Sequence, residues 1–145
     1  MKPFREYKTG ARWAFWRWTF TPSGYLTRLH LVKTPWFAVC LHWINGPDEE
    51  PWLHDHPVSF FSVVLRGGYF ELRDGGAGTP SRDGWRLWVN AVRAGADDRH
   101  RIHTVIPGTL TLAIMGPVRR RWGFHTPDGW VYWRDYNATT YGGAP

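Results

Sequence analysis

The stretch HDHPVSFFSVVLRGGY, residues 54–69, carries the strongest structural signal in the sequence. It joins a His-x-His pair to an apolar run, Val58 to Leu65, that ends in a Gly-Gly-Tyr turn. Alternate side chains of a β-strand lie on the same face of a sheet, so His54 and His56 are expected to direct both imidazoles toward one point. Because imidazole is the commonest protein ligand of transition metals, the pattern predicts half of a metal site inside a β-structure.

The rest of the chain consists of short β-branched and aromatic runs that are separated by turn residues. No segment keeps an amphipathic helical pattern over three turns without an interrupting Gly or Pro, so the evidence for helices is thin and the expected elements are strands. The expected strands are 13–21, 25–33, 36–44, 58–65, 69–73, 84–92, 101–106, 109–115, 123–125 and 130–133, and the expected hairpin turns are 22–24, 66–68 and 127–129. This pattern predicts an all-β barrel or sandwich, with residues 1–145 forming one domain and residues 141–145 fraying at its end.

The charge balance of the sequence limits the classes of binding partner that are expected. Eighteen Lys and Arg against twelve Asp and Glu give a formal charge of +6, which favours anionic partners such as carboxylates, phosphates or nucleic acid. The one dense basic run, 119–121, is more typical of a solvated turn than of a nucleic-acid site, so a small-molecule substrate is expected and nucleic acid is not.

The single cysteine, Cys40, excludes an intramolecular disulfide, and its apolar neighbours predict a buried side chain. The N-terminus has no apolar leader and nowhere do eighteen apolar residues run together. The sequence therefore predicts a cytoplasmic protein without a membrane segment.

Further metal ligands are sought among the remaining histidines and acids. His100 follows a polar turn and is the predicted third ligand, with His103 as its alternative. The two differ by an odd number of residues, so only one of them should face the metal. His42, in phase with Cys40, is either near the metal or a hydrogen-bonded or surface histidine. Glu71 is the candidate carboxylate ligand.

Arginine and aromatic side chains are the candidates for contacts with a substrate. Arg66, Arg101 and Arg121 lie on or beside expected strands, and an arginine fork near a metal would hold a carboxylate or phosphate, although each is alternatively a surface residue. Asp55 should point away from the metal and either orient a ligand or be solvated. Four aromatic residues are candidates for a pocket wall or for core packing: Trp88, Trp122, Phe124 and Trp133.

These motifs resemble the cupin superfamily, small jelly-roll barrels that hold a metal inside the barrel. His54, His56 and Gly67 match the first motif of that family over a resemblance that covers about residues 36–114. The family's glutamate is missing, because Phe60 and Phe61 stand where it belongs. The resemblance implies a cupin-like double-stranded β-helix without the usual fourth ligand.

The second cupin motif is matched only by Gly95 and His100, with stretched spacing and without its proline. The chain is also similar to small bacterial and phage cupin-like proteins that share a His-Asp-His-Pro segment and later Gly-Gly-Tyr, Trp-Gly-Phe and Gly-Trp segments. The matching residues here are 54–57, 67–69, 122–124 and 129–130. This second resemblance implies no particular activity.

The resemblance and the three-histidine set together predict one divalent transition metal, Fe(II) first, with zinc or nickel as alternatives. The expected function is an Fe(II) oxygenase acting on a small anionic or aromatic molecule. The alternatives are a zinc- or nickel-dependent isomerase, lyase or hydrolase, and a non-catalytic binding module. The resemblance also suggests a homodimer, for which the aromatic N-terminal hairpin offers a surface.

Overall fold

The computed structural model describes residues 13–21, 24–74, 81–95 and 97–142. These residues form twelve strands and one helix. The strands are β1 (Ala14–Phe20), β2 (Leu26–Lys33), β3 (Ala38–Ile44), β4 (Leu53–His54), β5 (Phe60–Arg66), β6 (Tyr69–Asp74), β7 (Gly84–Arg86), β8 (Val89–Val92), β9 (Arg99–Val105), β10 (Thr109–Met115), β11 (Gly123–Thr126) and β12 (Gly129–Tyr132). The helix, α1 (Trp133–Tyr141), follows the last strand directly.

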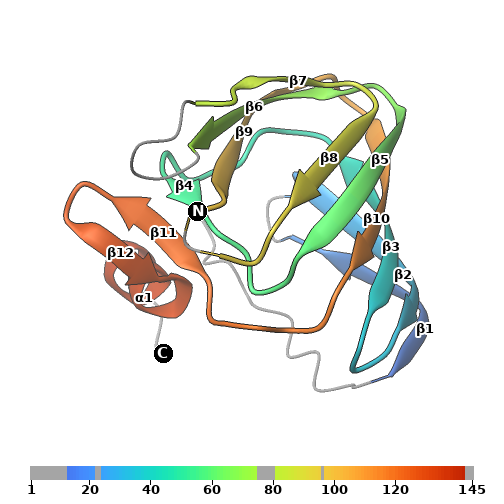
Figure 1. The fold of residues 1–145 in the computed structure, drawn as a ribbon, viewed down its shortest axis with the longest axis horizontal. Coiled ribbons are helices and arrows are strands. Elements are labelled where there is room, and N and C mark those ends of the chain that lie inside the picture. Colours follow the sequence, from blue (N-terminus) through green and yellow to red (C-terminus); the bar gives the residue numbers. More distant parts are fainter. Residues whose placement is uncertain (1–12, 22–23, 75–80, 96, 143–145) are drawn as a thin grey trace.

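Two antiparallel sheets curve around one interior, with β11, β12 and α1 lying to one side of the barrel (Figure 1). The first sheet has the strand order β1-β2-β3-β10-β5-β8, and the second has the order β12-β11-β4-β9-β6-β7. Strands that are adjacent in sequence repeatedly change sheets, as in β4, β5 and β6, and this alternation is typical of a jelly roll. The all-β jelly-roll prediction is confirmed.

The His-x-His pair does not begin the strand that follows it, contrary to the sequence-based expectation. His54 ends the short strand β4 in the second sheet, whereas β5 begins at Phe60 in the first sheet. Pro57 accounts for the break, because proline lacks a backbone N–H and restricts the residue before it to extended conformations. His56 therefore lies in the connection that crosses from one sheet to the other.

The expected strand 84–92 is two strands in different sheets. β7 pairs with β6 in the second sheet, and β8 pairs with β5 in the first. No glycine or proline marks the change at Leu87 and Trp88, so no turn residue indicates it. The other expected strands are confirmed, with ends that shift by one or two residues. Of the expected turn 22–24, residues 22 and 23 lie outside the described residues.

The helix α1 contradicts the expectation of an all-strand chain with a frayed end at Tyr141. Its buried residues are Trp133 and Asn137, too few to give a periodic apolar stripe in the sequence. The Tyr141 hydroxyl donates a hydrogen bond to the Glu50 carboxylate, which ties the end of the helix to the loop before β4. Residues 143–145 lie outside the described residues. Among those described, no helix is long and apolar enough to cross a membrane.

The Gly-Gly-Tyr turn between β5 and β6 is present as expected. Gly67 has a φ of +75°, and a Cβ atom there would lie 2.5 Å from Oγ1 of Thr109. The Thr109 hydroxyl in turn accepts a hydrogen bond of 2.9 Å from the backbone N–H of Gly68. The turn therefore needs glycine for both its backbone conformation and its close approach to β10.

The interior between the sheets is largely polar. One apolar cluster consists of Ile44, Val64 and Tyr69. The buried polar side chains facing the interior or lying near it include Thr19, His30, Ser62, Glu71, Arg73, Asn90, His100, Thr109 and Thr111. Cys40 is buried as expected, with its Sγ 3.1 Å from Nδ1 of His30. Polar groups on the inner face of a barrel offer hydrogen-bond partners to an enclosed small molecule.

Acid should destabilise the metal-free protein. Burial, reinforced by the charges of Arg28, Lys33 and Arg17, lowers the pKa of His30 from 6.5 to about 4. Between these pH values the unfolded chain binds a proton that the folded chain does not, so this histidine lowers the free energy of unfolding by up to about 1.4 kcal/mol per pH unit. Urea unfolding followed from about pH 8 down to about pH 4 should show the decrease below about pH 6.5. His30→Gln should make the decrease shallower without abolishing it, because His42, His54 and His56 contribute with the same sign. The exposed His103→Gln should leave the slope unchanged, and an unchanged slope in His30→Gln would contradict the assignment.

Candidate metal centre

Three histidines converge on the interior side of the second sheet. His54 on β4 and His100 on β9 are cross-strand neighbours, and His56 follows His54 by two residues. One nitrogen atom from each of the three lies within 4.8 Å of the others. The ring centroids are 4.7 to 5.0 Å apart. The structure thus brings together the three residues that the sequence suggested as ligands.

The orientation of the rings directs the Nε2 atoms into the cluster. Nε2 of His56 and Nε2 of His100 are 3.3 Å apart. Nδ1 of His100 contacts the Glu71 carboxylate, and Nδ1 of His54 lies 3.9 Å from Oδ2 of Asp48. Each Nδ1 that faces an acid leaves Nε2 of the same ring for a metal. Carboxylates behind ligating histidines are the usual way in which proteins orient such rings.

Burial keeps His54 and His56 neutral. It lowers the pKa of His54 to about 4, against the opposing effect of the Asp48 carboxylate. It also lowers the pKa of His56 well below 6.5, and the neighbouring His100 and His54 act in the same direction. A neutral imidazole presents the lone pair that a metal ion requires, so these two rings are ready to bind without losing a proton at neutral pH.

Glu71 is completely buried and stands behind His100. It accepts hydrogen bonds from Nη2 of Arg73 (3.1 Å), Nε of Arg86 (2.7 Å) and Nδ2 of Asn90 (3.1 Å). Burial alone would raise the pKa of Glu71, but the hydrogen bond and charge of His100 and the two guanidinium groups lower it to about 2. An ionised carboxylate only accepts, so Nδ1 of His100 donates and, in the neutral ring, Nε2 carries the lone pair. Glu71 thus contacts a ligand candidate from behind, which differs from the ligand role considered for it in the sequence.

The two alternative histidines lie elsewhere. His103 is exposed, with its Nδ1 3.5 Å from Nη1 of Arg101. His42 lies on β3 in the first sheet, opposite Arg28 on one side and Thr111 on the other. Within the described part of the chain, the group that can hold a metal consists of His54, His56 and His100.

Asp55 points away from the histidine rings, as expected, but it is fully buried rather than solvated. Its carboxylate accepts hydrogen bonds from the backbone N–H of Gly123 (2.9 Å), Nε1 of Trp130 (2.9 Å) and Nε2 of His125 (3.2 Å). Nη2 of Arg120 forms an ion pair with it at 3.1 Å. Asp55 therefore fastens the His-x-His segment to the β11–β12 hairpin.

The three arginines suggested as substrate anchors have other partners. Arg66 is exposed and donates to the backbone carbonyl of Gly108 at 3.0 and 3.2 Å. Arg101 donates to the carbonyl of Glu50 at 2.7 Å, in the loop before β4. Arg121 is exposed and its guanidinium stacks over an aromatic ring of β12. The structure does not place these side chains against the histidine cluster.

Aromatic rings enclose the cluster. The rings of Trp122 and Phe124 lie 6.1 and 6.2 Å from that of His54. Trp133 stacks on Trp122 at 5.7 Å and supports it from α1. Trp88, by contrast, is 79% exposed and is not part of this wall. Two of the four aromatic candidates therefore border the site directly.

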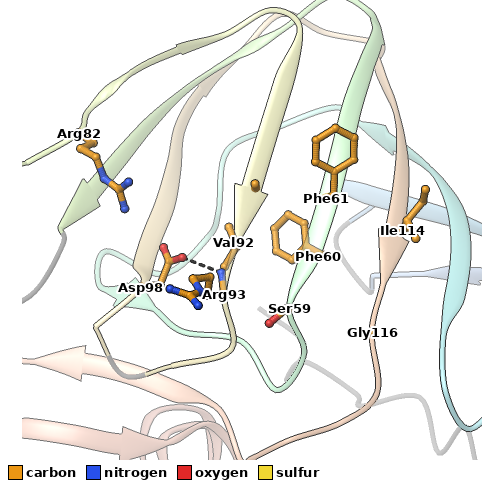
Figure 2. Close-up of a pocket in the computed structure, with 10 residues that line it drawn as sticks. Ser59, Phe60, Phe61, Arg82, Val92, Arg93, Asp98, Ile114 and Gly116 are labelled. Carbon is orange, nitrogen blue, oxygen red and sulfur yellow. Dashed lines mark hydrogen bonds between the residues drawn. The ribbon is translucent and has the colours of Figure 1, made fainter.

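A pocket of about 600 Å³ opens beside the cluster, between the ends of β5 and β8 (Figure 2). Its lining includes Phe60 and Val92 and the charged side chains of Arg82 and Arg93. Phe60 also belongs to the histidine site, because its ring lies 5.0 Å from that of His56. Phe60 therefore contacts both the pocket and the histidine cluster.

Sequence reasoning did not assign Phe60 or Asp48 to the site. The substituted motif position was the available signal for Phe60. For Asp48 the signal was its acidic loop directly before the histidine pair.

Comparisons with known proteins show one fold. No protein-family model matches the chain, and no curated protein matches it. Among solved structures, it is similar to the DMSP lyase DddQ from Ruegeria pomeroyi DSS-3, with 14% identity, a TM-score of 0.54, and 88% of this chain and 73% of that chain covered. It is similar to a cupin 2 conserved barrel domain protein from Rhodopseudomonas palustris, with 14% identity, a TM-score of 0.53 and coverages of 88% and 77%. An RmlC-like cupin from Shewanella frigidimarina NCIMB 400 has 16% identity, a TM-score of 0.50 and coverages of 83% and 97%.

Proposed function

The chain has the cupin fold, and from this premise we propose that it is a metal-dependent cupin enzyme with His54, His56 and His100 as the ligands. The observation that supports the proposal is the convergence of three imidazoles, each with one nitrogen atom within 4.8 Å of the others. Imidazole donors suit iron, zinc, copper and nickel.

The surroundings fit a bound ion. Nδ1 of His100 is oriented by the Glu71 carboxylate, and Nδ1 of His54 lies 3.9 Å from Oδ2 of Asp48. Nδ1 of His56 is buried and has no hydrogen-bond partner among the described residues. The ring of His56 is therefore held by packing against Phe60 and by its neighbours in the cluster, as suits a ligand whose partner is an ion.

We propose Fe(II) as the ion and oxygenation of a small anionic or aromatic molecule as the reaction. Three protein ligands leave coordination positions open, and Fe(II) would supply redox chemistry with dioxygen there, whereas zinc or nickel would supply Lewis-acid chemistry for an isomerase, lyase or hydrolase. Glu71 holds the proton on Nδ1 of His100. Phe60, Trp122 and Phe124 exclude bulk water from the rings of the cluster.

Metal content tests the proposal. Protein purified without an affinity tag, stripped of metal and reloaded anaerobically with iron, zinc, nickel and manganese in competition should hold near one equivalent of a transition metal per chain, measured by inductively coupled plasma mass spectrometry. His56→Ala removes one of three donors and should lose that metal while staying folded. His103→Ala removes an exposed histidine and should keep it. Absence of metal under every loading, or full metal occupancy in His56→Ala, would contradict the proposed metal site.

Oxygen uptake separates the reaction classes. Iron-loaded protein should consume oxygen in the presence of at least one member of a panel of small carboxylates and phenols, and the zinc-loaded protein should not. Turnover by the zinc form without oxygen uptake by the iron form would instead favour an isomerase, lyase or hydrolase.

A further inference from the structure

We propose that Arg28 and His42, on the inner face of the first sheet, bind an anionic group of a small ligand, a carboxylate or a phosphate. The inference rests on the proposed function in one respect, namely that the rest of the ligand would reach the metal. The anion site itself is argued from residues outside the histidine cluster.

The sheet register places both side chains in the interior. Arg28 on β2 is the cross-strand neighbour of His42 on β3, and His42 is in turn opposite Thr111 on β10. Side chains two residues apart on a strand share a face. Ile44, two residues after His42, belongs to the interior apolar cluster, so His42 and its neighbours Arg28 and Thr111 also face inward.

Two neighbouring buried nitrogens lack a partner among the described residues. Nε of Arg28 and Nε2 of His42 are shielded from solvent and have no hydrogen bond there. Buried polar atoms are paired in the great majority of cases, and the Nε–H of arginine can only donate. The set therefore indicates a missing acceptor.

The charge of Arg28 is also unbalanced. In the described part of the chain it forms no ion pair, whereas the buried Arg73 and the partly buried Arg86 both pair with Glu71. After burial, which is the larger cause, its positive charge lowers the pKa of His42. Since Arg28 and His42 are cross-strand neighbours, a ligand that contacts one of these side chains can also contact the other.

An uncompensated cation that is partly buried is costly, and an anion would relieve that cost. Carboxylates and phosphates match the planar donor fork of arginine. A neutral ligand would leave the charge unpaired. The chemistry therefore favours an oxyanion over a neutral aromatic molecule as the ligand of this interior.

Isothermal titration calorimetry tests the inference on the metal-free protein, with inorganic phosphate in one arm and benzoate in the other. Wild-type protein should bind at least one of them, and the arm that binds distinguishes a phosphate from a carboxylate ligand. Arg28→Met keeps a long side chain without the charge and should weaken binding about tenfold or more. Arg66→Met, which removes an exposed arginine, should leave the affinity unchanged.

The stability of Arg28→Met without added anion gives a second readout, which does not depend on the choice of ligand. Without anion, Arg28→Met should unfold at the same or a higher urea concentration than wild type, because it removes an unpaired charge. With the anion that binds, wild type should gain stability and Arg28→Met should not. Arg28→Lys, which keeps the charge without the fork, should bind more weakly than wild type.

Two results would overturn the inference: no binding of either anion by the wild type, or equal affinity in wild type and Arg28→Met. Metal content of Arg28→Met, measured separately, should remain that of wild type. Failure of the metal proposal would appear as an empty wild-type protein that still binds the anion through Arg28.

Discussion

Replacing Glu71 with alanine should lower the free energy of unfolding of the metal-free protein by about 3–5 kcal/mol. The carboxylate is completely buried and meets four donors, from Arg73, Arg86, Asn90 and His100. Arg73 itself is only 6% exposed, so its charge loses its closer ion-pair partner without gaining water and keeps only the longer pair with Asp98 at 3.7 Å. Breaking a buried pair by removing one partner is among the costliest single substitutions, because the other charge is left uncompensated.

The same substitution should weaken metal binding about 10- to 100-fold. Without the carboxylate, nothing at that position holds the proton on Nδ1 of His100 or orients its ring. Urea unfolding of metal-free protein measures the first effect, and competition with a chelator of known affinity measures the second. Glu71→Gln keeps the shape of the side chain, but its amide group has one acceptor oxygen and an NH₂ group that only donates. The four groups around it are themselves donors, so the stability of Glu71→Gln should be closer to that of Glu71→Ala than to that of wild type.

The exposed Glu49→Ala provides the matched control, since it removes an acidic side chain that is in contact with solvent. It should change stability by less than about 0.5 kcal/mol. A loss below about 1 kcal/mol for Glu71→Ala, or an unchanged metal affinity, would contradict the role assigned to Glu71.

Local patterns sufficed to predict the histidine pair and most strands. Two histidines separated by one residue tend to share a face, and His54 and His56 do lie at one point even though the strand ends between them. The alternation along β6 likewise gives Tyr69, Glu71 and Arg73 one shared face, and all three are buried. Such predictions depend only on neighbours in the sequence.

Pairings between distant strands could not be predicted in the same way. That Glu71 stands behind His100, rather than beside the metal, depends on the β6–β9 register and its irregularity next to Phe70. The inward position of Arg28 depends on the β2–β3 register in the same manner. Register is set by turns and by packing across the whole sheet, which no single segment records. The arginines chosen from the sequence as substrate anchors were those nearest to recognisable motifs. The interior arginine, Arg28, was missed.

Replacing Asp55 with alanine should also cost about 3–5 kcal/mol of unfolding free energy. The carboxylate is fully buried, and its loss leaves the Gly123 amide, the Trp130 indole N–H and the Arg120 guanidinium without their acceptor. Asp55 reinforces the β4–β11 pairing that joins the histidine segment to the β11–β12 hairpin. The loss of stability should therefore be local to the hairpin as well as global. Hydrogen exchange of the 123–132 region should accelerate more than that of β10.

The pairing with Arg120 separates a charge effect from a packing effect. In Asp55→Ala with Arg120→Leu, no guanidinium is left unpaired, so the double variant should recover part of the stability lost by Asp55→Ala alone. Because the Gly123 and Trp130 donors remain unpaired, the recovery should be incomplete. Across these variants, metal affinity should change with the stability of the hairpin and not with the charge at position 55. Asp55 faces away from the histidine rings and acts on them only by holding the backbone between His54 and His56. A double variant no more stable than Asp55→Ala would show that the Arg120 charge contributes nothing there, and a loss below about 1 kcal/mol for Asp55→Ala would show that the hairpin does not depend on this carboxylate.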